Sequence, residues 1–331
     1  MRILYFLLIH ILLSSCISVG HWPEIQEAEY DIETRLLNSE QMGSPCSMAV
    51  INENLFVLST EKQVYLYEEG AVIQKIGQIG RAEYEYQLPM IVRVYKDEIY
   101  VWCAMSLKFI VFTLDGIPMH EYQYDSAIAD FAVTEDKIII YNTGRRNENV
   151  LCVYDKLSGG VDYTVGNTSE EHRALLKLFS TAPLSVNGNK VWFAHKDKLS
   201  ICCLNLENSE QTTEAKIKST SFNVNRRLHT KDIQSYIRTN SAVMMLTTIG
   251  DECVVVAAEG VFESGDAGWD DGPRYFSIYN VNNQGNKCVK RIKASSLGDP
   301  ALFFICNERL YYLFHELTDD DIYLLRSFEL L

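Results

Sequence analysis

Basic residues are scarce relative to acidic ones in this chain of 331 residues. Lys and Arg together number 30, against 44 Asp and Glu, so the formal net charge is −14 at pH 7. A chain with this balance repels nucleic acid phosphates and anionic lipid surfaces. We therefore expect no nucleic acid partner, and contact with a membrane only through a lipid anchor.

The motifs of several common enzyme and metal sites are missing. The sequence has no C-x-x-C pair, which argues against zinc-ribbon and thioredoxin-type redox sites, and neither G-x-S-x-G nor H-E-x-x-H occurs. The absence of these motifs does not exclude a lyase that uses a lone His and Arg. The histidines are scattered singly, and we interpret each as structural: His120, His172, His195, His229 and His315. We expect no cofactor.

Long apolar runs are confined to the beginning of the chain. An apolar run from Ile3 to Leu13 follows Arg2 and precedes Ser14, Ser15 and Cys16, which is the layout of a secretory signal. The run is shorter than the roughly 20 residues that cross a bilayer. "LSSC" resembles the bacterial lipobox, so we predict that Cys16 carries lipid and begins the mature protein. An ordinary signal peptide with an incidental cysteine is the alternative.

Eight further cysteines occur after Cys16. An even number in an exported protein suggests disulfides. Most of them, however, lie in apolar runs such as "IYVWCA" and "FFICN". Such runs are typical of strands, and cysteines on strands of separate blades of a β-propeller would be too far apart to pair. We therefore expect buried free thiols that behave as small apolar side chains.

Helical periodicity is nearly absent. Short helices are expected only at residues 169–179 and 230–239, and the rest alternates β-rich runs with short polar turns. A polar turn followed by a dense β run recurs six times, in "NENLFVLS", "KDEIYVWC", "EDKIIIYN", "GNKVWFAH", "GDECVVVA" and "NERLYYLF". These runs are apolar on both faces, as strands between neighbouring sheets are.

Each repeat has strands before and after this unit, giving four strands over roughly 50 residues. We predict an all-β fold, a six-bladed β-propeller with four-stranded blades. A two-sheet sandwich would not explain the repeated unit. The last repeat has only three clear strands, so we expect a spare strand at 27–37 to close it and remove an exposed edge.

These patterns divide the chain into a signal peptide at 1–15, a tether at 16–26 and a single propeller at 27–331. The expected blades cover approximately 44–76, 88–124, 127–166, 181–217, 241–294, and 299–331 together with 27–37. Proline marks the start of four of them, at Pro45, Pro89, Pro183 and Pro300. Proline is tolerated at the first residue of a strand.

The stretch "IGQIGRAEYEYQLP" (76–89) and the strands after it resemble six-bladed β-propeller lipoproteins of Gram-negative bacteria, a group related to NHL-repeat and TolB-like propellers. Residues Gly77, Gly80, Glu83, Tyr84 and Pro89 match the phrase that joins blades in that group, whereas Ala82 replaces its usual Pro-Gly pair. The resemblance implies the fold and a location at the cell envelope. It implies no activity, since the group has no common one.

In physical terms, this stretch is expected to cross from one blade to the next. Gly77 and Gly80 can adopt positive φ, and Glu83 and Tyr84 would cap the crossing. Direct ligand contact by Arg81 or Tyr84 is the alternative.

Long insertions predict which face of the propeller is functional. When the four strands of a blade are lettered A to D from the axis outward, the B–C loops and the crossings from strand D to the next blade share one face. The insertions at 77–88, 142–149, 166–182, 217–241 and 259–273 all fall on that face. Function concentrates in long loops on a rigid scaffold. The candidate binding residues of this long-loop face are Arg81, Tyr84, Arg145, Arg146, Arg226, Arg227, His229, Trp269, Asp270 and Arg274. The arginines could neutralise an anionic partner, or be ordinary solvated charge.

The loop "SGDAGWDDGPR" offers two further interpretations. Asp266, Asp270 and Asp271 are a weak calcium candidate, since the loop lacks the last glutamate of an EF-hand; we therefore predict no metal. Trp269 could stack on a sugar or pack against the neighbouring blade.

Together these patterns predict a binding or scaffold protein, monomeric, exported and lipid-anchored to the bacterial outer membrane on its periplasmic or surface face. The expected partner is an envelope protein, a peptide or a glycan. The alternative is a propeller lyase or hydrolase that acts on an extracellular polysaccharide or a small ester.

Overall fold

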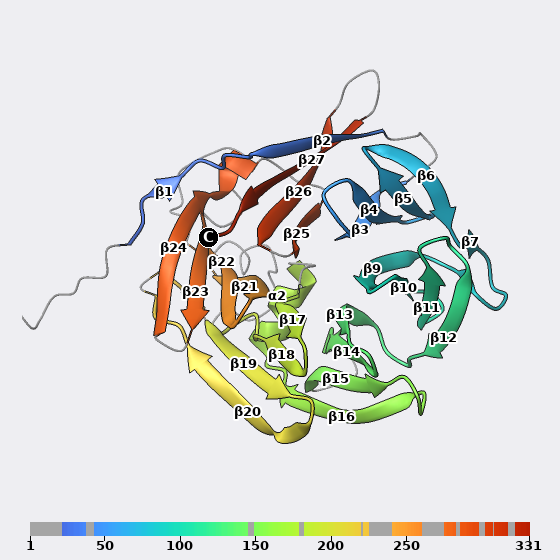
Figure 1. Cartoon of the computed structure of the whole chain (residues 1–331). Coiled ribbons are helices and arrows are strands. Elements are labelled where there is room, and N and C mark those ends of the chain that lie inside the picture. The colour runs from blue at the N-terminus through green and yellow to red at the C-terminus, as the bar shows by residue number, and fades with distance from the viewer. Residues whose placement is uncertain are drawn as a thin grey trace, which may run out of the picture.

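The computed structural model describes residues 22–37, 43–144, 149–178, 182–219, 221–224, 240–259, 275–282, 285–297, 302–306, 308–316 and 322–331. Six sheets stand around a central axis as the blades of a β-propeller (Figure 1). Each blade has four antiparallel strands, and one of the six sheets gains a short fifth strand, in parallel, from the N-terminal segment. The expected fold is therefore confirmed. No helix in the described part of the chain has the length and apolar character needed to cross a bilayer.

In each blade the strands are ordered from the axis outward, and in the first five blades this order is the chain order. Blade 1 consists of β3 (Pro45–Val50), β4 (Leu55–Thr60), β5 (Val64–Glu68) and β6 (Ala71–Ile76). Blade 2 consists of β9 (Pro89–Tyr95), β10 (Glu98–Cys103), β11 (Lys108–Thr113) and β12 (Pro118–Gln123). Blade 3 consists of β13 (Ile128–Val133), β14 (Lys137–Asn142), β15 (Asn149–Asp155) and β16 (Gly160–Asn167).

The last three blades complete the ring. Blade 4 consists of β17 (Leu184–Asn187), β18 (Lys190–Phe193), β19 (Ser200–Asn205) and β20 (Asn208–Lys216). Blade 5 consists of β21 (Ala242–Ile249), β22 (Glu252–Glu259), β23 (Tyr275–Asn282) and β24 (Gly285–Lys293), followed by the 3-10 turn η1 (Ala294–Leu297). Blade 6 consists of β25 (Leu302–Cys306), β26 (Arg309–Glu316), β27 (Ile322–Glu329) and β2 (Ile32–Leu37).

The ring is closed by the N-terminal strand, as the missing fourth strand of the last repeat predicted. β2 pairs antiparallel with β27, from Ile32 opposite Ser327 to Leu37 opposite Ile322. The innermost strands also touch in a complete circle, since β25 contacts both β3 and β21. The last blade therefore has the same four-stranded form as the others, and its outer edge is supplied by the beginning of the propeller.

A second N-terminal segment lies against blade 5. β1 (Ile25–Gln26) pairs in parallel with the outer strand β24, and the ring of Trp22 packs edge-on against Tyr279 with centroids 6.4 Å apart. These residues belong to the stretch that the sequence suggested as a tether, so the chain meets the propeller before it reaches β2.

The core is divided among the interfaces between neighbouring blades. One cluster of buried apolar side chains fills each of the six junctions, and the middle strands contribute to the clusters on both of their sides. This explains why the repeated β runs are apolar throughout and do not alternate. All eight cysteines after Cys16 are free thiols and five of them are buried, in agreement with the sequence interpretation.

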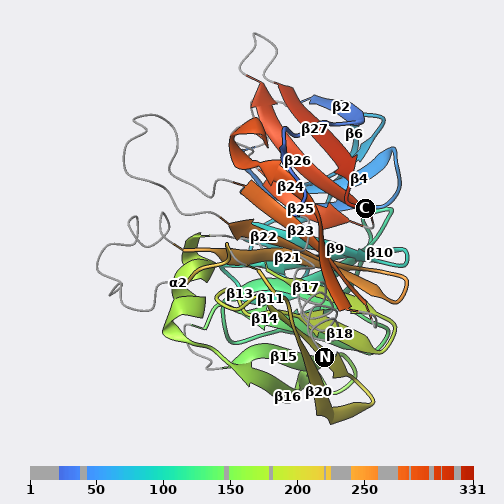
Figure 2. The same ribbon diagram turned by 90° about the vertical axis from the view of Figure 1, so that its left-hand side faces the viewer.

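The described helix lies on the long-loop face. α2 (Glu170–Leu178) is in the crossing from blade 3 to blade 4, where a helix was expected at 169–179. Figure 2 shows the propeller from the side, with α2 at the edge of that face. Ser169 precedes the helix, and its hydroxyl accepts the backbone N–H of His172 at 2.9 Å, which is an N-cap. The second expected helix, at 230–239, lies outside the described residues.

Candidate functional site

Most of the candidate residues of the long-loop face lie outside the described part of the chain. This applies to Arg145, Arg146, Arg226, Arg227, His229, Trp269, Asp270 and Arg274, to the calcium candidates Asp266 and Asp271, and to the lipid site Cys16. Only Arg81 and Tyr84 are described. Arg81 is exposed, whereas Tyr84 is partly buried and packs against the apolar cluster between blades 1 and 2.

The crossing that carries these two residues is a compact structure of its own. β7 (Gln78–Ile79) and β8 (Glu85–Tyr86) pair in parallel within it, and it joins β6 to β9 as predicted. Gly77 has a φ of 65°, and a side chain there would meet the rings of Tyr86 and Phe112. Glycine is therefore required both for the backbone conformation and for space.

Three expectations for this crossing are wrong. Gly80 does not have positive φ; instead a side chain there would collide with the carboxylate of Glu85. Glu85, and not Glu83, caps the turn, because its carboxylate accepts the backbone N–H of Ala82 at 2.8 Å. The capping tyrosine is Tyr86, which is fully buried and donates to the carbonyl of Ile76 at 2.6 Å. The parallel pairing of β7 and β8 places both functions two residues later than the sequence suggested.

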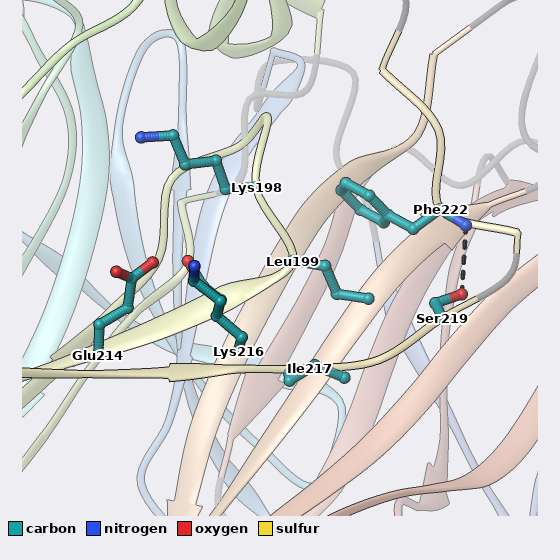
Figure 3. A pocket seen from close by; sticks show the side chains of 8 residues that line it. Lys198, Leu199, Glu214, Lys216, Ile217, Ser219 and Phe222 are labelled. Atoms are coloured by element: carbon teal, nitrogen blue, oxygen red, sulfur yellow. Dashed lines mark hydrogen bonds between the residues drawn. The ribbon is translucent and has the colours of Figure 1, made fainter.

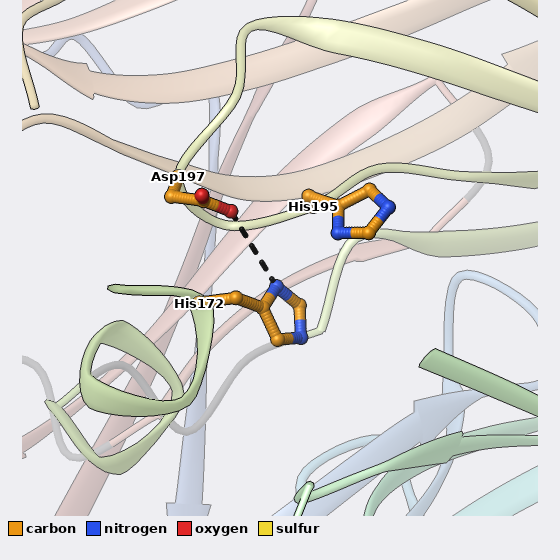
Figure 4. A group of neighbouring side chains, drawn as sticks. All are labelled: His172, His195 and Asp197. Carbon is orange, nitrogen blue, oxygen red and sulfur yellow. Dashed lines mark ion pairs between the residues drawn. The ribbon is translucent and has the colours of Figure 1, made fainter. Parts of the chain in front are cut away.

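The structure brings together two histidines that the sequence left apart. His172 lies in the first turn of α2, while His195 and Asp197 lie in the B–C loop of blade 4, after β18 (Figure 4). Each residue has one nitrogen or carboxylate oxygen that could coordinate a metal ion, and these three atoms all lie within 4.8 Å of one another. The rings of His172 and His195 are 5.3 Å apart at their centroids and nearly perpendicular. This group is hereafter the His-His-Asp cluster.

The His-His-Asp cluster is buried. His172, His195 and Asp197 are 0%, 9% and 7% exposed. Burial, followed by the charges of His195 and Lys196, lowers the pKa of His172 to about 3, so its ring is neutral at neutral pH. The pKa of His195 is also lowered, first by burial and then by Lys198, which Asp197 and Glu214 partly oppose. Each neutral ring carries one lone pair, and that of His172 is on Nδ1, which accepts the backbone N–H of Lys196 at 3.0 Å.

Lys196 extends from the same loop toward the axis of the propeller. Its side chain is fully buried, and Nζ donates to the carbonyl of Met244 in β21 at 3.2 Å. Burial lowers the pKa of Lys196 to about 7, although the charge of Asp130 opposes the change. Asp130 lies in the innermost strand β13, and it forms an ion pair with Arg93 of the neighbouring innermost strand β9. The inner strands thus carry a shared polar network.

A hollow of about 280 Å³ opens beside the His-His-Asp cluster, at the boundary between blades 4 and 5. It is lined by Lys198, Leu199, Ser200, Glu214, Lys216, Ile217, Ser219 and Phe222. Figure 3 shows the charged side chains of Lys198, Glu214 and Lys216 on one side and the apolar ones of Leu199 and Phe222 on the other. The lining comes from the B–C loop, the outer strand and the following crossing, all at the long-loop face.

One wall of this hollow is held by a buried carboxylate. Glu259, the last residue of β22, is 0% exposed and accepts hydrogen bonds from four hydroxyl groups. They belong to Ser219 and Ser221 at 2.9 Å each, and to Ser277 and Tyr279 at 2.7 Å each. The full set of donors offsets the desolvation of Glu259 and fixes the crossing that contains Ser219 and Phe222. The wall is therefore preformed.

A second hollow, of about 470 Å³, lies on the opposite face between blades 5 and 6. Its lining includes Glu308, Arg309 and Glu329. Arg309 forms ion pairs with Asp31 and, at 3.6 Å, with Glu329. Arg309 and Glu329 of this second hollow are thus already engaged in ion pairs.

Sequence reasoning missed the His-His-Asp cluster and the hollow for one reason. Both depend on which loops adjoin across the long-loop face, whereas the histidines were considered one at a time. A usable signal was present: "AHKDK" (194–198) occupies a B–C loop, and His172 occupies the crossing just before the same blade.

Comparison with known proteins supports the architecture. Residues 37–195, just under half of the chain, match the DUF5128 family, which is described as a 6-bladed beta-propeller. A presumed exported protein of Bacteroides fragilis superposes with a TM-score of 0.62 at 11% identity, covering 92% of this chain and 98% of that one.

Two further solved structures are similar in fold. A member of the DUF4221 family from Bacteroides vulgatus gives a TM-score of 0.63 at 9% identity, covering 92% of this chain and 99% of the other. Hydrazine synthase of Kuenenia stuttgartiensis gives 0.51 at 10% identity, covering 83% of this chain and 78% of that one. No curated protein sequence matches the chain. At these identities the likeness concerns the fold alone.

Proposed function

We propose that this protein is an exported, lipid-anchored six-bladed propeller that binds a protein, peptide or glycan partner at the bacterial cell envelope through its long-loop face. The signal-like residues 1–15 and the lipobox-like "LSSC" support export and lipidation at Cys16. The similar propeller of Bacteroides fragilis is also described as a presumed exported protein, which agrees with this location.

The hollow between blades 4 and 5 is the observation that carries the binding role. It combines an apolar wall of Leu199, Ile217 and Phe222 with two lysines and a single glutamate. An apolar surface beside an excess of positive charge suits a partner that presents an apolar group next to an anionic one. Because Glu259 fixes one wall, little conformational entropy is lost when a partner binds.

The size of the hollow favours surface recognition over enclosure. Small-molecule sites usually occupy about 300–1,000 Å³ and bury most of their ligand. At about 280 Å³, this hollow accepts one protruding side chain or chain end of a larger partner. The lyase or hydrolase alternative needs catalytic groups that substrate can reach, and the described His-His-Asp cluster is almost completely buried.

Capture of partners from native envelopes tests this function. The lysines of the hollow are replaced in a Lys198→Ser/Lys216→Ser variant, and the control replaces two exposed lysines at the other face, Lys96→Ser/Lys190→Ser. Both variants lose the same charge. We expect the first to retain less than about a tenth of the partner and the control to retain most of it. Equal retention by the two variants would contradict the proposal.

A further inference from the structure

The His-His-Asp cluster leaves several buried polar atoms without a hydrogen-bond partner among the described residues. They are Nε2 of His172, Nδ1 of His195 and Oδ1 of Asp197. Buried polar atoms are almost always paired in folded proteins, and an exception often marks a missing ion or water. Oδ1 of Asp197 lies 3.9 Å from Nδ1 of His172, which already acts as an acceptor toward the backbone N–H of Lys196. Two acceptor atoms cannot satisfy one another, whereas a cation between them would satisfy both.

We propose that His172, His195 and Asp197 bind a divalent transition-metal ion of the zinc class. Two imidazole nitrogens and one carboxylate oxygen are the ligand types that Zn²⁺ takes, with a water in the fourth position. Calcium does not fit, because it requires six to eight oxygen ligands. The proposal is independent of the identity of the partner at the long-loop face.

The distances are close to those that such an ion requires. Nδ1 of His172 lies 3.9 Å from Oδ1 of Asp197, and all three donors lie within 4.8 Å of one another. Bonds of about 2.0–2.1 Å in tetrahedral geometry separate two ligand atoms by about 3.4 Å. The first pair must therefore approach by about 0.5 Å, which side-chain rotation supplies.

The carboxylate is already oriented for this role. Oδ2 of Asp197 accepts the hydroxyl of Ser169 at 2.9 Å, and the same hydroxyl accepts the N–H of His172. Ser169 thus couples the two ligands and leaves the other oxygen, Oδ1, turned toward the rings. Outer hydrogen bonds of this kind orient the ligands of metal sites.

One contact must change when the ion binds. Nδ1 of His172 accepts the backbone N–H of Lys196 at 3.0 Å, so its lone pair is engaged. The ion takes this lone pair, and the ring turns away from the N–H. The side chain of Lys196 does not obstruct the ion, because Nζ is directed toward Met244 at the axis.

Bound metal would join two separate segments of the long-loop face. His172 belongs to α2, whereas His195 and Asp197 belong to the loop that continues into Lys198 and Leu199 of the hollow. An ion held by all three residues fixes the crossing helix to that loop. The bound ion would therefore rigidify the wall beside the hollow.

Titration of the metal-stripped full chain in detergent with Zn²⁺, followed by calorimetry, tests the site. We expect one equivalent to bind tightly. The near-isosteric Asp197→Asn and His195→Gln variants should weaken binding about a hundredfold or more, since loss of an outer-shell partner alone costs about 10–100-fold. His120→Gln, which changes an exposed histidine of β12, should bind as the unmodified chain does. Circular dichroism checks that each variant is folded.

Co²⁺ spectra keep the proposal falsifiable if a variant does not fold. The unmodified chain should give the visible bands of four-coordinate Co²⁺ with nitrogen and oxygen ligands. A thiolate charge-transfer band would assign the ion to the free cysteines and overturn the proposal. Absence of binding, or binding that both folded variants retain at full strength, would overturn it as well.

Discussion

Leu36, near the beginning of the propeller, lies directly opposite Tyr323, near its end, in the antiparallel pairing of β2 with β27. Leu36 is 0% exposed and shares the apolar cluster between blades 6 and 1 with Tyr323. This pairing joins the two ends of the chain and replaces an exposed sheet edge with a hydrogen-bonded one. The stability of the whole ring should therefore depend on residues close to the N-terminus.

Leu36→Ala tests this dependence. Truncating a fully buried leucine costs about 2–5 kcal/mol through lost burial and a residual cavity. Ile32→Ala is the matched control, since Ile32 belongs to the same strand but is 40% exposed; it should cost less than about 1 kcal/mol. Denaturant unfolding measures both variants. Equal losses would show that β2 does not contribute to the core.

The lipid anchor is tested through Cys16. Cys16→Ser should move the protein from the membrane fraction to the soluble fraction, because the acyl chains supply the hydrophobic attachment, at about 0.8 kcal/mol per buried CH₂. Fractionation after a carbonate wash, followed by immunoblotting, measures the distribution. Retention of the variant in the membrane fraction would contradict lipidation at this residue.

Gly77→Ala tests the crossing between blades 1 and 2. Alanine at this position would have to keep the left-handed backbone conformation of Gly77, which costs a residue with a Cβ about 1–2 kcal/mol. Its methyl group would also press against the rings of Tyr86 and Phe112. Gly188→Ala is the control, since Gly188 has a φ of 57° but open space around it. We expect Gly77→Ala to lower the free energy of unfolding by about 1–3 kcal/mol more than Gly188→Ala does. The same loss in both would remove the steric part of the explanation.

The lowered pKa of Glu121 leads us to expect that the stability of the protein depends on pH. Burial acts to raise the pKa of Glu121, but hydrogen bonds from Lys108, at 2.7 Å, and from the Tyr84 N–H outweigh it, so the pKa is lowered overall. A carboxyl whose pKa is lower in the folded state stabilises the protein above its unfolded pKa of about 4.3, and this contribution is lost as the pH falls through the folded pKa.

Glu121→Gln should therefore be less stable than the unmodified protein at pH 7, by about 1–3 kcal/mol. The difference should shrink as the pH falls below about 4. Unfolding measured at several pH values gives this difference directly. Glu53→Gln, which changes an exposed acid of the opposite face, is the control and should show no comparable trend. A constant difference for Glu121→Gln across the range would contradict the linkage.

The six-bladed architecture could be predicted from the sequence because the same turn-and-strand unit recurs six times along the chain. Each β run is apolar on both faces and follows a polar turn, and only a ring of sheets buries six such units equally. The missing fourth strand of the last repeat likewise predicted the closure by β2. The positive φ of Gly77 was also predictable, because a chain that leaves an outer strand needs a left-handed residue there.

Side-chain neighbours across loops were not predictable in the same way. His172 and His195 meet because α2 folds over the B–C loop of the next blade, and no periodicity encodes that packing. Glu85 and Tyr86 replace Glu83 and Tyr84 as capping residues because the short parallel pairing of β7 with β8 sets the register. Most of the arginines proposed for binding lie outside the described residues, so their role stays a prediction.

Site-directed photocrosslinking in native envelopes tests the central claim most directly, namely that the long-loop face binds the partner. A photoreactive residue is placed at the exposed positions Arg81 and Lys216 on that face, and at the exposed positions Glu53 and Asp97 on the opposite face. We predict that the first two positions yield the same discrete crosslinked partner and that the other two yield none. Crosslinks of equal yield from both faces, or from Glu53 and Asp97 alone, would contradict the account.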